Sequence, residues 1–163
     1  AHYERDDLKV LEVEYTVIDK KTDNSARYDA VVQLPDGAVT GVPAGIWIME
    51  TKTAGAFTAN TVDGWDLDGE IVGQYTLWQR CKLDRVFGPL RGVIVNLIGK
   101  QKQPQFTRTY VVPQPELAKR HLKVLGHLDA RIAQHRRGRY WPQYMNACIG
   151  RYGRCAYYDA CRG

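Results

Sequence analysis

A nearly continuous apolar run, GVIVNLIGK, occupies residues 92–100. A run of this length is typical of a strand that is buried on both faces, because a strand with one exposed face alternates apolar and polar residues. We expect this run to form a buried strand of a mixed sheet. With 163 residues, the chain has the size of one ordinary domain and can bury a core.

Three strands are predicted before this run and one after it. Residues 9–18 alternate apolar side chains with Glu12, Glu14 and Thr16, which is the period of a strand with one buried face. Residues 27–34 and 45–53 follow as two further strands, with the tight turn PDG at 35–37 between them. These three strands form a meander, and residues 105–113 are expected to pair beside the apolar run.

Two helices are predicted. In residues 70–83, apolar and aromatic side chains recur at helical spacing. The second helix begins at Pro115, carries one apolar face from Leu117 to Ile132, and has Arg136 and Arg137 in its last turn before Gly138. The prediction is an α/β fold with a central mixed sheet flanked by helices, made of a three-strand meander, a helix and two further strands. It forms a single domain, 1–163, in which 140–163 is a cysteine-containing tail.

The two halves of the chain carry opposite charge. Residues 1–80 contain 7 Lys and Arg against 14 Asp and Glu, a net charge of −7, whereas residues 81–163 contain 16 against 4, a net charge of +12. A carboxylate-rich half suits divalent cations, and a basic half suits a polyanion such as DNA or RNA. Solvated surface charge is the plain alternative, but segregation of this size favours a nucleic-acid partner.

The sequence carries no membrane or export signal. No run of 18 or more apolar residues occurs, and the N-terminal AHYERDDLK lacks the basic-then-apolar pattern of a secretion signal. We expect an intracellular, cytoplasmic protein with no membrane partner. The chain begins with Ala rather than Met, which fits either processing or a fragment that lacks an upstream segment.

A carboxylate and an amine, Glu50 and Lys52, close the third predicted strand in the sequence METKT. Because strand side chains alternate, both project to the face that carries Ile46 and Ile48. Charged side chains that lie next to buried isoleucines need a partner of opposite charge or a hydrogen bond. The simplest interpretation is an ion pair at a strand end, worth at most about 1 kcal/mol.

Asp29, on the neighbouring strand of the meander, supports a second interpretation, because it can stand beside Glu50. Paired carboxylates repel unless a hard cation lies between them, and Mg²⁺ or Mn²⁺ accepts such ligands while retaining waters. Lys52 would hold or activate one of those waters, next to a metal that lowers the pKa of the water and neutralises charge on a phosphate. This arrangement predicts phosphodiester hydrolysis.

Three short segments carry a family resemblance. RYDAVV with Asp29, METKT with Glu50 and Lys52, and GQYTLW with Gln74 resemble the three successive motifs of the PD-(D/E)XK nucleases. The closest likeness is to the RecB-like group, which includes CRISPR-adaptation and phage exonucleases. The resemblance implies a restriction-endonuclease-like core and a Mg²⁺- or Mn²⁺-dependent deoxyribonuclease. We expect an exonuclease that acts on DNA ends or single strands.

The resemblance also implies a role for each residue. Asp29 and Glu50 would bind the metal, Lys52 would be catalytic, and Gln74 would complete the catalytic site. An acidic residue on the preceding strand often joins the metal, and Glu14 is the candidate here. The helix motif of the family ends in a tyrosine four residues after the glutamine; this chain has Trp78 there and Tyr75 beside Gln74, and both are expected to contact nucleic acid.

Three cysteines, Cys148, Cys155 and Cys161, lie close together near the end, and Cys81 lies far upstream. No C-x-x-C pair occurs, which disfavours a zinc ribbon, and a reducing compartment disfavours disulfides. Burial as small apolar residues is the ordinary alternative. Iron–sulfur nucleases of the RecB-like group end in a similar tail, so the resemblance implies a [4Fe–4S] cluster. Its fourth ligand is either Cys81 or a cysteine on an absent upstream segment.

The basic half is expected to supply phosphate contacts. These come from Lys100, Lys102, Arg108, Arg136, Arg137 and Arg139. The expected partners are DNA, as single strands or ends, and a recombination or replication protein, and the oligomeric state is left open. The rival function is a catalytically inactive nucleic-acid-binding or scaffold module that retains the nuclease fold.

Overall fold

The computed structural model describes residues 8–55, 57, 64–103, 105–141, 149–150, 153–156 and 158–159. The chain forms two compact units, Ala1–Lys123 and Val124–Gly163. The first unit holds the sheet and the first helix, and the second holds the greater part of a long helix with a short hairpin. Among the described residues, no helix has the length and apolar character needed to cross a membrane.

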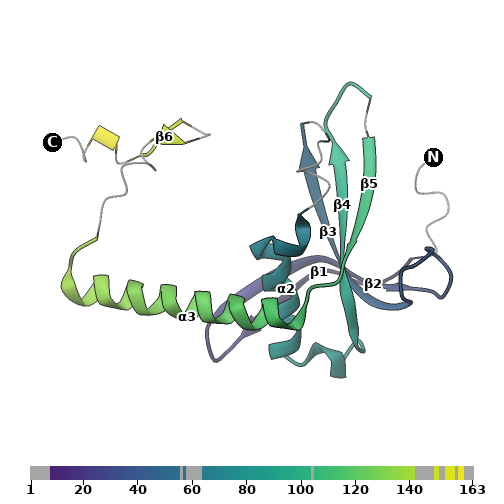
Figure 1. Ribbon diagram of the computed structural model, residues 1–163, viewed down its shortest axis with the longest axis horizontal. Helices are drawn as coiled ribbons and strands as arrows, with labels where there is room; N and C mark the ends of the chain where they lie inside the picture. The colour runs from purple at the N-terminus through teal and green to yellow at the C-terminus, as the bar shows by residue number, and fades with distance from the viewer. Residues whose placement is uncertain are drawn as a thin grey trace. The chain divides into compact units, whose positions relative to one another are not determined.

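A five-stranded mixed sheet forms the centre of the first unit (Figure 1). Its strands lie side by side in chain order: β1 (Lys9–Asp19), β2 (Asn24–Leu34), β3 (Gly45–Ala54), β4 (Leu90–Gly99) and β5 (Gln105–Val111). The strands β1, β2 and β3 form an antiparallel meander, β3 and β4 are parallel, and β4 and β5 are antiparallel. The predicted α/β class and its order of meander, helix and two further strands are confirmed.

The helix α2 (Gly69–Arg80) makes the crossover that the parallel pair β3 and β4 requires. Asp68 caps its start, because the Asp68 carboxylate accepts the backbone N–H groups of Glu70 (2.9 Å) and Ile71 (3.1 Å). The turns η1 (Trp65–Leu67) and η2 (Leu83–Arg85) flank the helix. Because Lys82 adopts a left-handed conformation, with φ of 54°, α2 ends before the predicted boundary at residue 83.

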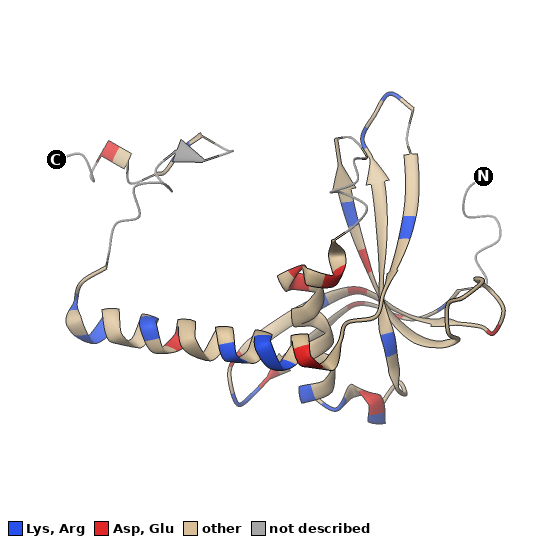
Figure 2. Ribbon diagram, viewed as in Figure 1, with Lys and Arg blue, Asp and Glu red and all other residues tan. Residues whose placement is uncertain are grey.

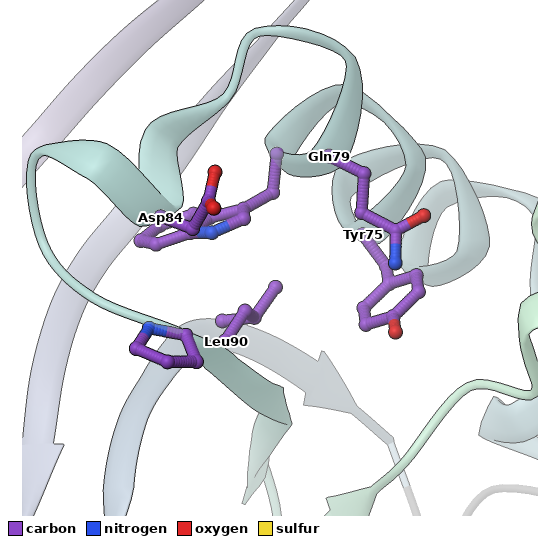
Figure 3. Close-up of a pocket in the computed structure, with 6 residues that line it drawn as sticks. Tyr75, Gln79, Asp84 and Leu90 are labelled. Carbon is purple, nitrogen blue, oxygen red and sulfur yellow. The ribbon is translucent and has the colours of Figure 1, made fainter.

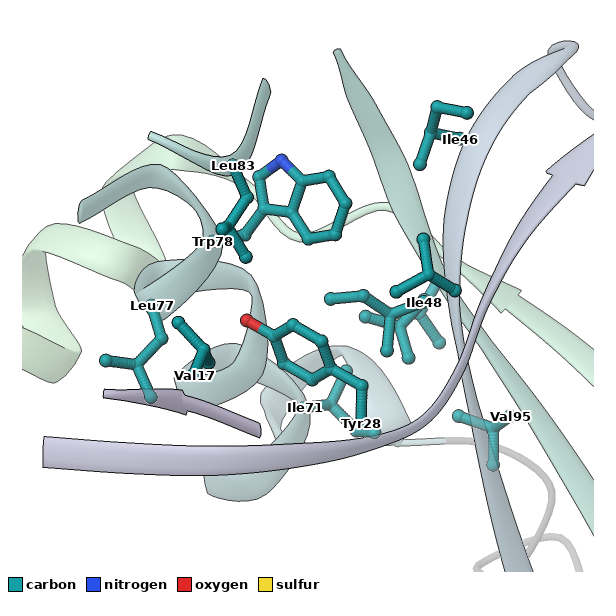
Figure 4. Close-up of a cluster of buried hydrophobic side chains, with 12 residues drawn as sticks. Val17, Tyr28, Ile46, Ile48, Ile71, Leu77, Trp78, Leu83 and Val95 are labelled. Atoms are coloured by element: carbon teal, nitrogen blue, oxygen red, sulfur yellow. The ribbon is translucent and has the colours of Figure 1, made fainter. Parts of the chain in front are cut away.

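The main core lies between α2 and the sheet (Figure 4). Ile71, Leu77 and Trp78 of α2 share this core with side chains from all five strands, which include Val17, Tyr28, Ile46, Ile48, Val95 and Val111. A second apolar cluster lies on the opposite face, where Trp47 is covered by Val39 and Val42 of the β2–β3 connection. The predicted alternation of β3 is therefore confirmed, with its isoleucines on the helix face and Trp47 on the other.

The strand β1 departs from regular alternation. Its pairing with β2 shifts register between Val10 and Glu12, and Glu14 adopts a left-handed conformation with φ of 51°. Val13 is 65% exposed as a result, although simple alternation predicts it beside Tyr15 and Val17 on the buried face. An irregular strand reorients single side chains in a way that a period of two does not predict.

The helix α3 (Pro115–Gly138) has the predicted boundaries, except that Gly138 is its last residue and not the residue after it. Its first turns belong to the first unit, where His121 lies against Gly73 of α2. The apolar face that the sequence predicts is present, but Val124, Leu128 and Ile132 are exposed. In the second unit, the strands β6 (Ile149–Gly150) and β7 (Gly153–Arg154) form a short hairpin.

Candidate active site

Polar side chains gather where β2 separates from β3. The backbone ladder between these strands ends at the pair Ala30–Met49. One position further along, the carboxylate of Asp29 accepts the backbone N–H of Thr51, with 2.7 Å between Oδ2 and N. The hydrogen bond from Thr51 to the Asp29 side chain therefore extends the contact between the two strands beyond their backbone hydrogen bonds. It holds the Asp29 carboxylate beside the C-terminal residues of β3, next to Glu50.

Glu50 is the buried centre of the cluster. Its side chain is 8% exposed and lies on the α2 face of β3, beyond Ile46 and Ile48. Oε1 lies 2.9 Å from Nζ of Lys52, and Oε2 accepts a hydrogen bond of 2.7 Å from Nε2 of Gln74. Each carboxylate oxygen therefore has one donor, as a buried charge requires.

Gln74 is placed by the contact between α2 and the sheet. The hydroxyl of Tyr28 donates to the backbone carbonyl of Gln74 at 3.1 Å, which ties the middle of α2 to β2. Because Nε2 of Gln74 is committed to Glu50, its other amide atom, Oε1, is fixed in orientation. That oxygen is buried and has no hydrogen-bond partner among the described residues. A buried acceptor without a donor is costly and indicates a place for a water or a ligand.

Lys52 bridges two carboxylates. Its Nζ lies 2.6 Å from Oε2 of Glu70 as well as 2.9 Å from Oε1 of Glu50. Glu70 belongs to the first turn of α2, four residues before Gln74, so both side chains leave the helix on the same face. Sequence reasoning missed Glu70, although its spacing of four residues from Gln74 was the available signal.

The surroundings of Glu50 and Lys52 shift the pKa of each side chain. Burial raises the pKa of Glu50, and the charge of Asp29 adds to the rise, whereas the hydrogen bonds from Lys52 and Gln74 oppose it. Partial burial lowers the pKa of Lys52, but its hydrogen bonds and the charges of Glu70 and Glu50 outweigh burial and raise that pKa. Lys52 is therefore an ammonium at neutral pH, able to donate and to attract negative charge, and not a base.

The donor set suits a hard divalent cation. Asp29 and Glu50 supply carboxylate oxygens, and Oε1 of Gln74 is a neutral oxygen without a partner. Mg²⁺ is typically held by one or two carboxylates together with waters and substrate phosphates. Within the described part of the chain, no group of three or more His, Cys, Asp or Glu side chains is placed to hold a metal ion. The residues present therefore fit an open site of two carboxylates, not a closed protein cage.

Glu14, the predicted third carboxylate, makes a different contact. Its Oε2 lies 3.1 Å from the Arg27 guanidinium, and both side chains are exposed. The left-handed backbone at Glu14 accompanies this arrangement. The structure thus gives Glu14 an ion pair on the meander, while Asp29, Glu50, Lys52 and Gln74 come together as predicted.

Trp78 and Tyr75, which were expected to contact nucleic acid, face different surroundings. Trp78 is 1% exposed and packs against Tyr28 and Phe87 in the core, so its ring does not lie on the surface. The helical spacing of residues 70–83 predicts Trp78 on the buried face of the helix, and its burial agrees with that prediction. Tyr75 is half-buried and stays a candidate contact.

Tyr75 lines a cavity of about 280 Å³ at the far end of α2 (Figure 3). The other lining residues are Trp78, Gln79, Asp84, Pro89 and Leu90. Leu90 pairs with Ile46 at the start of β3, whereas Glu50 pairs with Val95. Ile46 and Glu50 are four residues apart on β3, about 13 Å at the rise of a strand, and none of the four clustered residues lines the cavity.

The basic side chains that were predicted to hold phosphates divide between the two units. Lys100 and Lys102 are exposed after β4, and Arg108 of β5 donates from Nε to the Asn96 side chain at 3.4 Å. The other group, Arg136, Arg137 and Arg139, is exposed at the end of α3. Figure 2 shows basic residues repeated along α3 and acidic residues at the start of α2.

Only two of the four cysteines fall among the described residues. Cys155 is exposed, and Cys81 is partly buried against the main core. Burial raises the pKa of the Cys81 thiol, and the charge of Asp19 adds to the rise. Cys148 and Cys161 lie outside the described residues.

No family model matches this chain, and no curated protein is significantly similar to it.

Proposed function

We propose that this chain is a metal-dependent DNA nuclease with a restriction-endonuclease-like core of the PD-(D/E)XK type. The observation that carries the proposal is the convergence of Asp29, Glu50, Lys52 and Gln74 where β2 separates from β3. These are the residues that the sequence resemblance assigns to catalysis. They come from three different elements, so their convergence is not a consequence of sequence proximity.

Each residue has a definite role in the proposed reaction. Asp29 and Glu50 would hold Mg²⁺ or Mn²⁺, which when bound lowers the pKa of a ligated water and offsets charge on the phosphate. Gln74 fixes the Glu50 carboxylate through Nε2 and offers Oε1 to a water or to the ion. The Lys52 ammonium orients the attacking water and stabilises the negative charge that develops on the phosphate.

The proposed substrate is DNA, as ends or single strands, in an intracellular setting. The support is the concentration of positive charge after residue 80, with exposed lysines following β4 and exposed arginines at the end of α3. Such side chains bind the phosphate backbone without reading its sequence. A recombination or replication protein remains a proposed partner.

One observation favours the rival function, an inactive binding or scaffold module. Both oxygens of Glu50 already have donors, Lys52 and Gln74, and a metal must displace at least the ammonium from one of them. A chain that bound DNA through its basic half and kept this cluster as a structural ion pair would have the same contacts.

The experiment that separates the two functions is cleavage of labelled single- and double-stranded DNA. With Mg²⁺ or Mn²⁺ we expect shortened products, and with excess EDTA we expect intact DNA, because the ion supplies the activated water. Native gels of the same mixtures report binding. Retarded but intact DNA in the presence of both metals would establish the inactive module instead.

We propose further that the tail carries a [4Fe–4S] cluster held by Cys148, Cys155 and Cys161, with a fourth ligand other than Cys81. The support is the resemblance of the three-cysteine tail to that of the iron–sulfur nucleases, and the packing of Cys81 on the core disfavours it as the fourth ligand. In full-length protein prepared without oxygen, we expect about four irons per chain. Cys155→Ala should lose this iron, whereas Cys81→Ala should keep it.

The absorption spectrum and an iron assay measure both outcomes. Bleaching by Cys81→Ala would assign the fourth ligand to Cys81. A colourless wild-type protein with one zinc ion would replace the cluster by a zinc site.

A further inference from the structure

Glu70 is held in place at the start of α2 and directed towards β3. Its backbone N–H bonds to the Asp68 cap at 2.9 Å, so the first turn of the helix is fixed. Its Oε2 lies 2.6 Å from Nζ of Lys52. Four residues later, Gln74 reaches the neighbouring Glu50. The helix α2 therefore presents one polar side chain to each charged residue of the METKT segment.

The two carboxylates that share Lys52 differ in exposure. The Glu50 side chain is 8% exposed, and the Glu70 side chain is 54% exposed. Glu50 also lies beside Asp29 and Gln74, which are the other oxygen donors of the cluster, whereas Glu70 faces Lys52. A divalent cation would therefore compete with the Lys52 ammonium for Glu50. The ion pair between Lys52 and Glu70 would remain.

We propose that Glu70 is a positioning residue that retains the Lys52 ammonium when a divalent cation takes Glu50. This inference rests on the proposed function, because it needs the cation to bind at Glu50. Without Glu70, Glu50 is the remaining carboxylate partner of the Lys52 ammonium within this cluster. The ammonium then stays at Glu50 and competes with the cation for its carboxylate. With Glu70, the ammonium stays beside the site, 2.6 Å from a second carboxylate, and the oxygen of Glu50 is released.

A double-mutant cycle of Mn²⁺ affinity tests the proposal without relying on cleavage. Isothermal titration calorimetry of the full chain is carried out on the wild type, Glu70→Gln, Lys52→Met and the double variant. We expect Glu70→Gln to weaken Mn²⁺ binding about tenfold when Lys52 is present, and by less than about twofold when Lys52 is methionine. Lys52→Met alone should tighten Mn²⁺ binding, because the competing ammonium is gone.

The matched control is Glu116→Gln. Glu116 also lies in the first turn of a helix, 2.6 Å from a lysine, and its side chain is 69% exposed. Its removal should leave Mn²⁺ affinity unchanged. Glu70→Asp keeps the charge on a shorter side chain and should recover part of the affinity that Glu70→Gln loses.

The outcomes separate this inference from the function on which it rests. Equal weakening by Glu70→Gln in both Lys52 backgrounds would mean that Glu70 acts on the cation directly, and no weakening would make the Glu70–Lys52 contact an ordinary surface pair. Either result overturns the positioning role and leaves a cleaving, Mn²⁺-binding wild type intact. A wild type that neither binds Mn²⁺ nor cleaves DNA overturns the proposed function, and the positioning role with it.

Discussion

Lys52→Ala is expected to lower the rate of DNA cleavage by about 10²–10³-fold, the usual cost of removing one group that stabilises the transition state. Its ammonium is the only cation among the interactions that the structure describes at Glu50. The measurement is the single-turnover rate with saturating Mn²⁺, which isolates the chemical step from DNA binding. DNA binding should remain, because the proposed phosphate contacts lie on other elements.

The control for this variant is Lys20→Ala, which removes an exposed lysine from the β1–β2 turn and should leave the rate unchanged. The Lys52 variant should still unfold cooperatively, since alanine opens space for water beside the Glu50 carboxylate. If Lys52→Ala cleaved DNA at the wild-type rate in a preparation free of contaminating nuclease, METKT would not be an active site.

Gly92→Ala is expected to destabilise the first unit by about 3 kcal/mol, at the upper end of what an added methyl group costs in a packed interior. A Cβ at this position would lie 2.7 Å from Cζ3 of Trp47 and closer still to the carbonyl oxygen of Val111. Neither atom is the end of a flexible side chain. Because Gly92 lies opposite Trp47 in the β3–β4 ladder, the strand that carries Glu50 and Lys52 must shift.

Urea unfolding followed by tryptophan fluorescence measures this loss, since Trp47 and Trp78 are both fully buried. Gly126→Ala is the matched control: nothing lies within 4 Å of the added Cβ in α3, and alanine favours a helix by up to about 1 kcal/mol over glycine. If Gly92→Ala were as stable as Gly126→Ala, the close packing of β4 between Trp47 and β5 would not hold.

Much of the fold follows from hydrophobic periodicity. The alternation of residues 45–53 predicts which side chains of β3 face α2, and the apolar run at 92–100 predicts the buried strand β4, which lies between β3 and β5. The same alternation places Glu50 and Lys52 on one face, and the turn at 35–37 brings Asp29 to the neighbouring strand. These local rules were sufficient because the strands are regular over these residues.

The remaining features depend on irregular geometry and on long-range packing. The left-handed backbone at Glu14 breaks the period of β1, and Glu14 pairs with Arg27. The motif position of Trp78 predicted a contact with nucleic acid. The side chain is instead buried in the core, because it lies two helical turns after Ile71 on the same face of α2. Glu70 belongs to no motif; its spacing from Gln74 places it on the same face of α2, and the structure adds its contact with Lys52.

The hydrogen bonds that build the candidate site have a consequence for the order of folding. They join residues that are 18, 22, 24 and 46 positions apart, for the pairs Lys52–Glu70, Thr51–Asp29, Gln74–Glu50 and Tyr28–Gln74. Loops of this length close at similar entropic cost, since doubling a loop adds only about 0.6 kcal/mol. All of these partners precede residue 75, and a nascent chain emerges from its N-terminus. The residues of the candidate site can therefore come together before the basic helix α3 has been synthesised.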